Sequence, residues 1–137
     1  MKRVLTVLLS VVCLTLTACA VNQTALSEGL DRSAKAYNRM IRWHEFESAV
    51  MTYAGPEHRE ESLKRATALI KQGISITDFR ILSTTYVPAA KSGDVMAEFD
   101  YFMLPSNRIK TISHRQQWLY QEESKSWILK NGLPPFE

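Results

Sequence analysis

The chain has 137 residues, 45% of them hydrophobic and 23% charged, with a formal net charge of +3. This length is enough for one domain with a single core, and no internal repeat or low-complexity segment divides it. Lys2 and Arg3 supply two of the three excess positive charges, so residues 19–137 carry only +1. A nearly neutral domain gives no electrostatic argument for binding nucleic acid.

An export signal is predicted at the N-terminus. Lys2 and Arg3 form a positive segment, residues 4–16 are almost wholly Val, Leu and Thr, and Thr17-Ala18 adds small residues. That order is typical of a secretory signal peptide. The apolar run is too short to span a bilayer as a permanent helix.

The end of this segment, Leu16-Thr17-Ala18-Cys19, resembles the lipobox of bacterial lipoproteins. The resemblance implies that residues 1–18 are removed and that the Cys19 thiol, a strong nucleophile once ionised, receives a diacylglyceryl group. Two alternatives are a signal without lipidation and a short N-terminal core helix in which Cys19 is incidental. Because Cys13 leaves with the signal and Cys19 carries lipid, no disulfide is expected.

The lipobox resemblance also implies a location. Acyl chains on Cys19 would anchor the protein in the membrane of the cell envelope, where stable attachment takes more than one chain. In lipoproteins of Gram-negative bacteria, Asp after the Cys commonly retains the protein at the inner membrane. Ala20 stands there in this chain. That resembles the outer-membrane default, with the domain facing the periplasm.

Three helices are predicted after the anchor. Residues 19–25 are read as the lipidated Cys and a short tether, and 26–137 as one domain. Apolar residues recur every three to four positions from Leu26 to Ile41 and again from about Glu45 to Tyr53, which indicates two amphipathic helices. A third helix begins at Pro56, a residue suited to the first helical turn, and Gly73 suits its end.

Four strands are predicted after the helices. The period changes to two over 74–87, with a change of phase near Asp78 that indicates a bulge. A turn is expected over 88–94, then strands over 95–103, 108–120 and 126–130 with short connections. Helices followed by strands indicate an α+β domain. We therefore expect three helices packed on one face of a curved, four-stranded antiparallel meander.

Two stretches resemble the nuclear-transport-factor-2-like superfamily. Residues 37–49, which include Tyr-Asn-Arg-Met-Ile-Arg-Trp-His-Glu-Phe, look like the turn between its first two helices. Gln117-Trp118 with Trp127-Ile128-Leu129 looks like its last hairpin. The resemblance covers roughly residues 26–136 and implies a cone-like, cystatin-related fold with a long helix inside the sheet. It also implies frequent dimerisation and, often, a pocket at the open end. It implies no activity, because the catalytic motifs of the superfamily's isomerases and dehydratases are not matched.

No catalytic or metal-binding residue is predicted. His44-Glu45 begins an HExxH motif, but Ser48 stands where the second His would be needed. His58 lies in the solvated first turn of the third predicted helix, so three histidines are not expected to converge. No nucleophile elbow, P-loop or dinucleotide fingerprint occurs, and we expect no cofactor and no metal.

A pocket is the alternative to a packed interior. Its candidate residues are polar or aromatic side chains of the type that line ligand sites: Tyr37, Trp43, Asp100, His114, Gln116 and Trp118. His114, Gln116 and Trp118 share one face of their strand. The opposite face is no more apolar, so the pattern does not say which face looks inward. Such aromatic residues more often belong to the core.

Two functions follow. The first is a membrane-anchored envelope lipoprotein without enzymatic activity, which binds an envelope protein, forms a homodimer or acts as a structural accessory. The second is a pocket protein of the same fold that binds a small apolar molecule or acts like an isomerase or dehydratase. A cavity in which His114 faces another titratable group would favour the second. An interior filled by Trp and Phe would favour the first.

Overall fold

The structure is a computed structural model that describes Met1 and residues 22–137. The predicted signal beyond Met1, the lipobox, Cys19 and the first residues of the tether lie outside the described residues. Residues 22–25, the rest of the predicted tether, are helical and belong to the first helix. Within the described part of the chain, no helix combines the length and the hydrophobicity needed to cross a membrane.

Three helices come first, as predicted. They are α1 (Lys2–Arg42), α2 (Phe46–Tyr53) and α3 (Pro56–Lys71). The predicted apolar stripe of α1 is its buried side, with Leu30, Ala34, Tyr37 and Ile41 in the core. Each lies three or four residues from the next, so all four fall on one side of a helix with 3.6 residues per turn.

Four strands follow and form an antiparallel meander in the order β1-β2-β3-β4. They are β1 (Ile74–Val87), β2 (Ser92–Met103), β3 (Lys110–Gln121) and β4 (Ser126–Leu129), and a short 3-10 helix, η1 (Pro88–Ala90), joins the first two. The predicted bulge is confirmed by a register shift between Ile76 and Asp78 of β1. A second shift, between Ile81 and Ser83, was not predicted.

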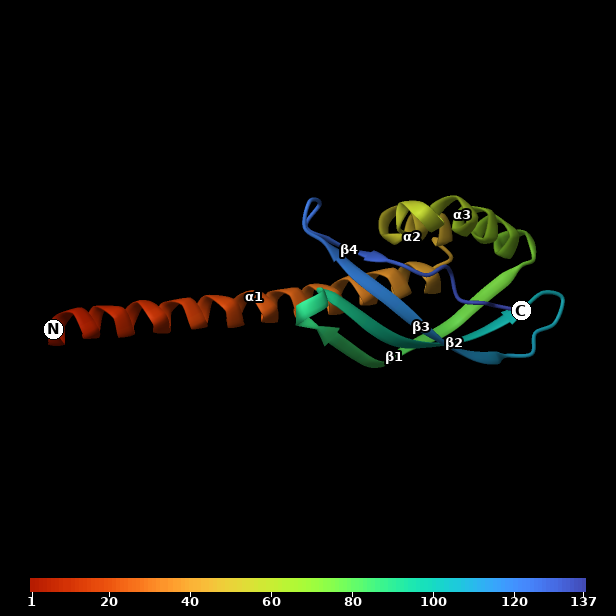
Figure 1. The fold of residues 1–137 in the computed structure, drawn as a ribbon. Helices are drawn as coiled ribbons and strands as arrows, with labels where there is room; N and C mark the ends of the chain where they lie inside the picture. The colour runs from red at the N-terminus through yellow and green to blue at the C-terminus, as the bar shows by residue number, and fades with distance from the viewer.

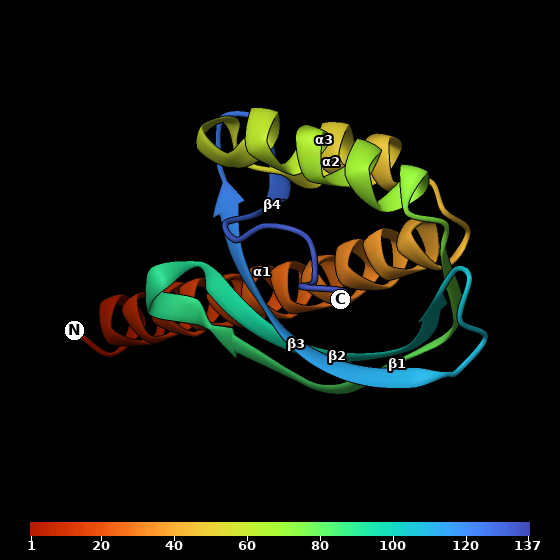
Figure 2. The same cartoon turned by 90° about the vertical axis from the view of Figure 1, so that its right-hand side faces the viewer.

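The helices all lie on one side of a bent sheet. In Figures 1 and 2, α1 runs along the inside of the bend, between the sheet and the pair formed by α2 and α3. The predicted α+β class, with helices first and an antiparallel meander after them, is therefore confirmed. The core lies between α1 and the sheet, where Val95, Ala97 and Phe99 of β2 are fully buried.

The predicted turn over 88–94 was too long, because β2 already begins at Ser92. Gly93 belongs to this strand, where the absence of a side chain allows α1 to lie close to the sheet. A Cβ at this position would lie 2.3 Å from Leu30 Cδ2 and 2.9 Å from the Thr85 carbonyl oxygen. The missing side chain of Gly93 lets Leu30 bring α1 onto the sheet.

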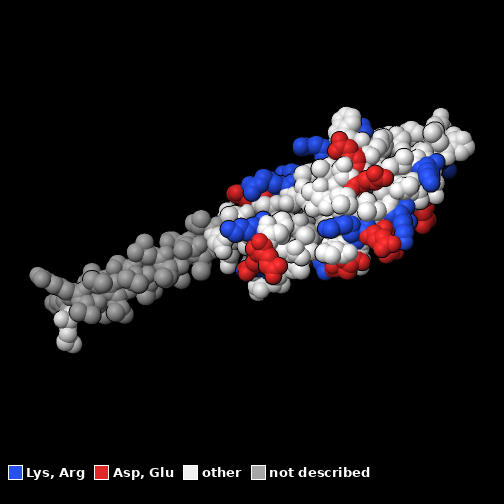
Figure 3. Space-filling view, turned by 90° about the horizontal axis from the view of Figure 1, so that it is seen from above, with Lys and Arg blue, Asp and Glu red and all other residues white. Residues whose placement is uncertain are grey.

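The outer side of the sheet carries charged side chains that form ion pairs between neighbouring strands. Arg80 of β1 reaches Glu98 at 2.6 Å and Asp100 at 2.9 Å on β2, and Arg115 of β3 reaches Asp94 at 2.7 Å. In Figure 3, which looks onto the α2–α3 side instead, acidic and basic side chains are also interspersed. The charged side chains on both sides are thus mixed in sign.

Candidate functional site

The inner face of β3 carries the predicted pocket residues. Gln116 and Trp118 are fully buried against the helices and His114 is half-buried, whereas Ser113, Arg115 and Gln117 face solvent on the other side. The structure thereby fixes the orientation that the sequence pattern left open. His114, Gln116 and Trp118 look inward.

A pair of amides lies in the middle of this face. The Gln116 Nε2 group donates to Asn38 Oδ1 at 2.6 Å, and Asn38 Nδ2 donates to Gln116 Oε1 at 3.2 Å. Asn38 Nδ2 also donates to the Ala34 carbonyl oxygen at 2.9 Å. Because both residues are fully buried, each amide depends on the other for its hydrogen bonds.

Aromatic rings fill much of the rest of the inner face of the sheet. Tyr37 and Tyr53 both meet the ring of Trp118 edge-on, with centroids 5.8 and 5.7 Å away. Phe99 packs against Phe136 at 5.6 Å. Burial raises the pKa of the Tyr37 phenol well above its usual range, and its hydroxyl has no hydrogen-bond partner among the described residues. This phenol therefore stays neutral and acts as a packing group.

His114 lies at the edge of the packed interior. Burial lowers the pKa of its imidazole, and a hydrogen bond to the backbone of Gly132 partly opposes that effect. Its Nε2 atom is buried and has no partner within the described part of the chain. At neutral pH the imidazole is consequently uncharged.

Asp100 and Trp43 lie apart from the other four predicted pocket residues. Asp100 is on the outer side of the sheet, where a hydrogen bond from Arg80 and another from Thr111 hold the pKa of its carboxyl below its usual range. Trp43 follows the last residue of α1 and is 65% exposed, with the Arg42 guanidinium 5.1 Å from its ring centroid. The structure thus brings Tyr37, His114, Gln116 and Trp118 to the inner side of the sheet and leaves Asp100 and Trp43 outside it.

His44 has a role that the sequence did not reveal. It lies in the bend between α1 and α2 with a left-handed backbone, φ 63°, and its Nε2 accepts a hydrogen bond from the Ile76 backbone N–H at 3.1 Å. Partial burial, followed by the nearby charge of Arg42, lowers the pKa of this imidazole. Among residues 22–137, no three His, Cys, Asp or Glu side chains are grouped to hold a metal ion.

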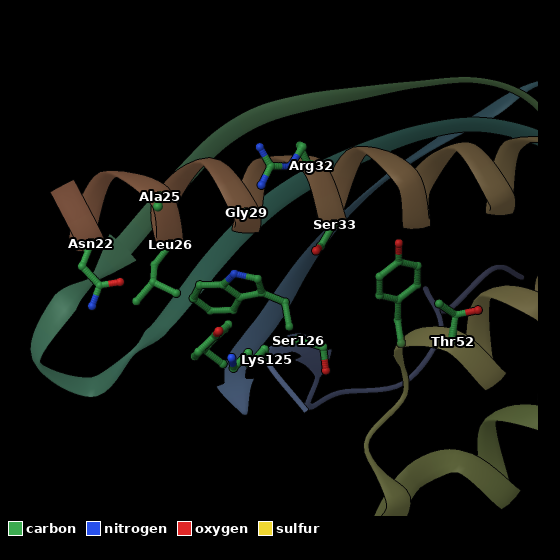
Figure 4. A pocket seen from close by; sticks show the side chains of 12 residues that line it. Asn22, Ala25, Leu26, Gly29, Arg32, Ser33, Thr52, Lys125 and Ser126 are labelled. Atoms are coloured by element: carbon green, nitrogen blue, oxygen red, sulfur yellow. The ribbon is translucent and has the colours of Figure 1, made fainter. Parts of the chain in front are cut away.

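A cleft of about 450 Å³ opens between α1, the end of α2 and the β3–β4 hairpin (Figure 4). Twelve residues line it, among them Asn22, Leu26, Gly29, Tyr53, Tyr120 and Trp127. Its floor is Trp127, whose indole rests on Gly29; a Cβ on that glycine would lie 3.2 Å from Trp127 Nε1. Sequence reasoning missed this cleft. The available signal was Gly29 itself, a glycine inside a strongly helical stretch.

Comparisons with known proteins concern the fold. No protein-family model matches the chain, and no curated protein sequence matches it either. A similar solved structure is the intermembrane space region of the chloroplast protein ARC6, with a TM-score of 0.50 and 13% sequence identity. The similarity covers 74% of this chain and 95% of that one. It supports the α+β arrangement described above.

Proposed function

We propose that this chain is a lipid-anchored protein of a bacterial cell envelope whose domain acts as a non-enzymatic binding or structural module. The observation that carries the proposal is the sequence Leu16-Thr17-Ala18-Cys19 at the end of an apolar run. In this proposal residues 1–18 direct export and are removed, and Cys19 carries the lipid.

The short distance along the chain from Cys19 to the folded domain is compatible with a domain that lies close to the membrane. Asn22, three residues after Cys19, is already helical and belongs to α1, and Leu30 of the same helix is fully buried in the core. A lipid on Cys19 would therefore hold the α1 side of the domain close to the bilayer. Ala20 after the Cys favours the outer membrane of a Gram-negative cell, with the domain in the periplasm.

The packed interior favours a binding or structural role over catalysis. Trp118, Tyr37, Phe46 and Phe99 fill the inner side of the sheet, and the two polar side chains at its centre bind each other. A general acid or base needs reach to a substrate proton, and the inward-facing His114 has no titratable partner described beside it. These features support a module that acts through its surface.

The finer fold assignment belongs to the same proposal. A bent sheet that holds one long helix supports the cone-like, nuclear-transport-factor-2-like reading. The ARC6 region, which its description places in an intermembrane space, offers a similar domain that lies between two membranes. Both are compatible with a small domain that works in an envelope compartment.

The anchor is tested by replacing Cys19 with Ser and following a palmitate analogue into the protein in growing cells. We expect the wild-type chain to be labelled, shortened by the signal and recovered with membranes, and C19S to lose the label. Cys13→Ser is the matched control and should keep the label, because Cys13 leaves with the signal. If C19S still incorporates the palmitate analogue, the proposed anchor is wrong.

The second candidate function, a pocket for a small apolar molecule, is favoured by one observation. The Tyr37 hydroxyl and the His114 Nε2 atom are both buried and without partners among the described residues. Buried polar atoms normally find a partner, so a ligand that supplies one would stabilise the protein. A thermal-shift screen of small apolar alcohols and ketones tests this, with His114→Leu as the variant that should remove any shift.

A further inference from the structure

The cleft beside α1 differs from the packed interior in its charge. Arg32 of α1 and Lys125 of the hairpin both line it, and none of the described residues that line it is Asp or Glu. In the described part of the chain, neither cation takes part in an ion pair. Two free cations beside one opening favour an anionic ligand.

The floor of the cleft is apolar. Trp127, Tyr120 and Leu26 line it, and Trp127 is only 4% exposed. The Trp127 Nε1 group is a buried donor without an acceptor among the described residues. In Figure 4, Leu26 and Ser33 extend from α1 toward Lys125 and Ser126 of the hairpin, while Arg32 is drawn at the other edge of the helix. The cleft therefore offers an apolar surface beneath a positively charged rim.

The cleft lies at the end of the described part of α1 that leads toward Cys19. Asn22, three residues after Cys19, is among its lining residues. A second hollow of about 280 Å³ shares Asn22, Leu26, Tyr120 and Lys125 with it. It adds Lys91 and Glu122, which pair with each other, so Arg32 and Lys125 remain the unpaired charges among the described residues that line the two hollows. The two hollows are neighbours, and the residues they share lie on the side of the domain nearest the proposed anchor.

We propose that this cleft binds the phosphate-bearing headgroup of an anionic glycerophospholipid. Lys125 and Arg32 hold the phosphate at the rim, while the partly exposed Leu26 and Tyr120, beside the buried Trp127, contact the glycerol and the upper part of an acyl chain. The volume lies within the range of about 300–1,000 Å³ that is usual for small-molecule sites. Lys and Arg side chains close to a membrane attract anionic headgroups, and the two cations here would supply the same attraction. The choice of a lipid over free phosphate rests on the anchoring proposed above.

The test uses the protein in the form that cells produce, labelled with 15N, in micelles of an uncharged maltoside detergent. The indole N–H signals of Trp43, Trp118 and Trp127 are followed during titration with dihexanoylphosphatidylglycerol, dihexanoylphosphatidylcholine or inorganic phosphate. We expect a saturable shift of the Trp127 signal with phosphatidylglycerol, a much smaller one with phosphatidylcholine and none with phosphate. The Trp43 signal, which comes from outside the cleft, should not move.

The double variant Arg32→Gln/Lys125→Gln should weaken phosphatidylglycerol binding about tenfold or more, because it removes both charge-assisted contacts. Lys71→Gln/Arg108→Gln is the matched control, since it removes the same charge from exposed positions outside the cleft. An unmoved Trp118 signal in each variant shows that the fold is intact.

Three results would overturn the proposal. They are an unmoved Trp127 signal, equal shifts with phosphatidylcholine and phosphatidylglycerol, and an equal shift with inorganic phosphate, which would make the cleft a site for the free ion. The titration does not use the anchor for attachment. It can therefore succeed where the labelling of Cys19 fails, or fail where that labelling succeeds.

Discussion

The side-chain amides of Asn38 and Gln116 bind each other through two hydrogen bonds, of 2.6 and 3.2 Å, across 78 positions of the sequence. One residue belongs to α1 and the other to β3, and both are fully buried. The pair fixes the position of the helix along the sheet, because sliding either element would leave two amides without partners in the core. A polar pair of this kind gives a unique register that apolar contacts alone define less sharply.

Breaking this pair from one side should destabilise the fold. Asn38→Leu leaves the Gln116 amide buried without its partner, so we expect a loss of about 1–3 kcal/mol in the free energy of unfolding. Gln116→Met should cost a similar amount. The double variant should cost clearly less than the sum of the two, because no amide is then left unsatisfied. Urea unfolding of the purified protein measures all three, and strictly additive losses would contradict the pairing.

Two tryptophans with opposite exposure provide a second prediction. Trp118 is 1% exposed and packs against Tyr37 and Tyr53, so Trp118→Ala should cost about 3–5 kcal/mol. Trp43 is the matched control, since its ring is mostly in solvent and Trp43→Ala should cost less than about 1 kcal/mol. Melting curves of the two variants separate these values. A small loss for Trp118→Ala would place that ring outside the core.

Two glycines test the close approach of α1 to the sheet. Gly93→Ala places a Cβ 2.9 Å from the Thr85 carbonyl oxygen, a backbone atom that cannot turn away, and closer still to Leu30. We expect a loss of about 1–3 kcal/mol from this overpacking. Gly132→Ala meets only Ser62 Oγ at 3.7 Å, an ordinary contact, and should change the stability little. Similar unfolding midpoints for both variants would argue against the close approach.

The stability should also fall in mild acid. In the folded state, the pKa of His44 and that of His114 lie below the ordinary value of 6.5, in both cases mainly because of burial. The folded protein then binds fewer protons than the unfolded chain near that pH. The stabilisation is therefore complete above about pH 6.5 and is lost as the pH falls below it. Urea midpoints at pH 7.5 and pH 5.5 measure the loss.

A double variant separates the contribution of the two histidines to this pH dependence from that of the carboxylates. His44→Asn keeps a residue that tolerates the left-handed backbone, and His114→Gln keeps a polar side chain of similar size. The difference between the two pH values should shrink in the double variant. A pH dependence equal to that of the wild type would assign the effect to other groups.

The order and type of the elements could be read from the sequence, because the apolar period changes clearly from 3.6 to two after Gly73. The start of β2 could not be predicted from the sequence. Gly93 looks like a turn residue, but a glycine is needed there because Leu30, more than sixty positions away, packs against it. The local sequence pattern does not reveal such a contact, so the predicted turn over 88–94 ended too late in the chain.

The candidate site was less predictable than the fold. Both faces of β3 carry polar residues, and only the contact with Asn38 shows that Gln116 belongs inside. Asp100 resembled a pocket residue until its partner Arg80, on the neighbouring strand, placed it on the outer side. The cleft needs α1 and the β3–β4 hairpin together, and no single stretch of sequence contains both walls.

The contact between His44 and Ile76 has a consequence for solubility. β1 is an edge strand of 14 residues, a length at which free backbone groups invite pairing with other chains. His44 occupies the Ile76 N–H near one end, and two register shifts bend the strand further along. Such irregularities oppose edge-to-edge aggregation between copies of a protein. A protonated or missing His44 would therefore leave the Ile76 N–H free to pair with another chain at this end of the edge strand.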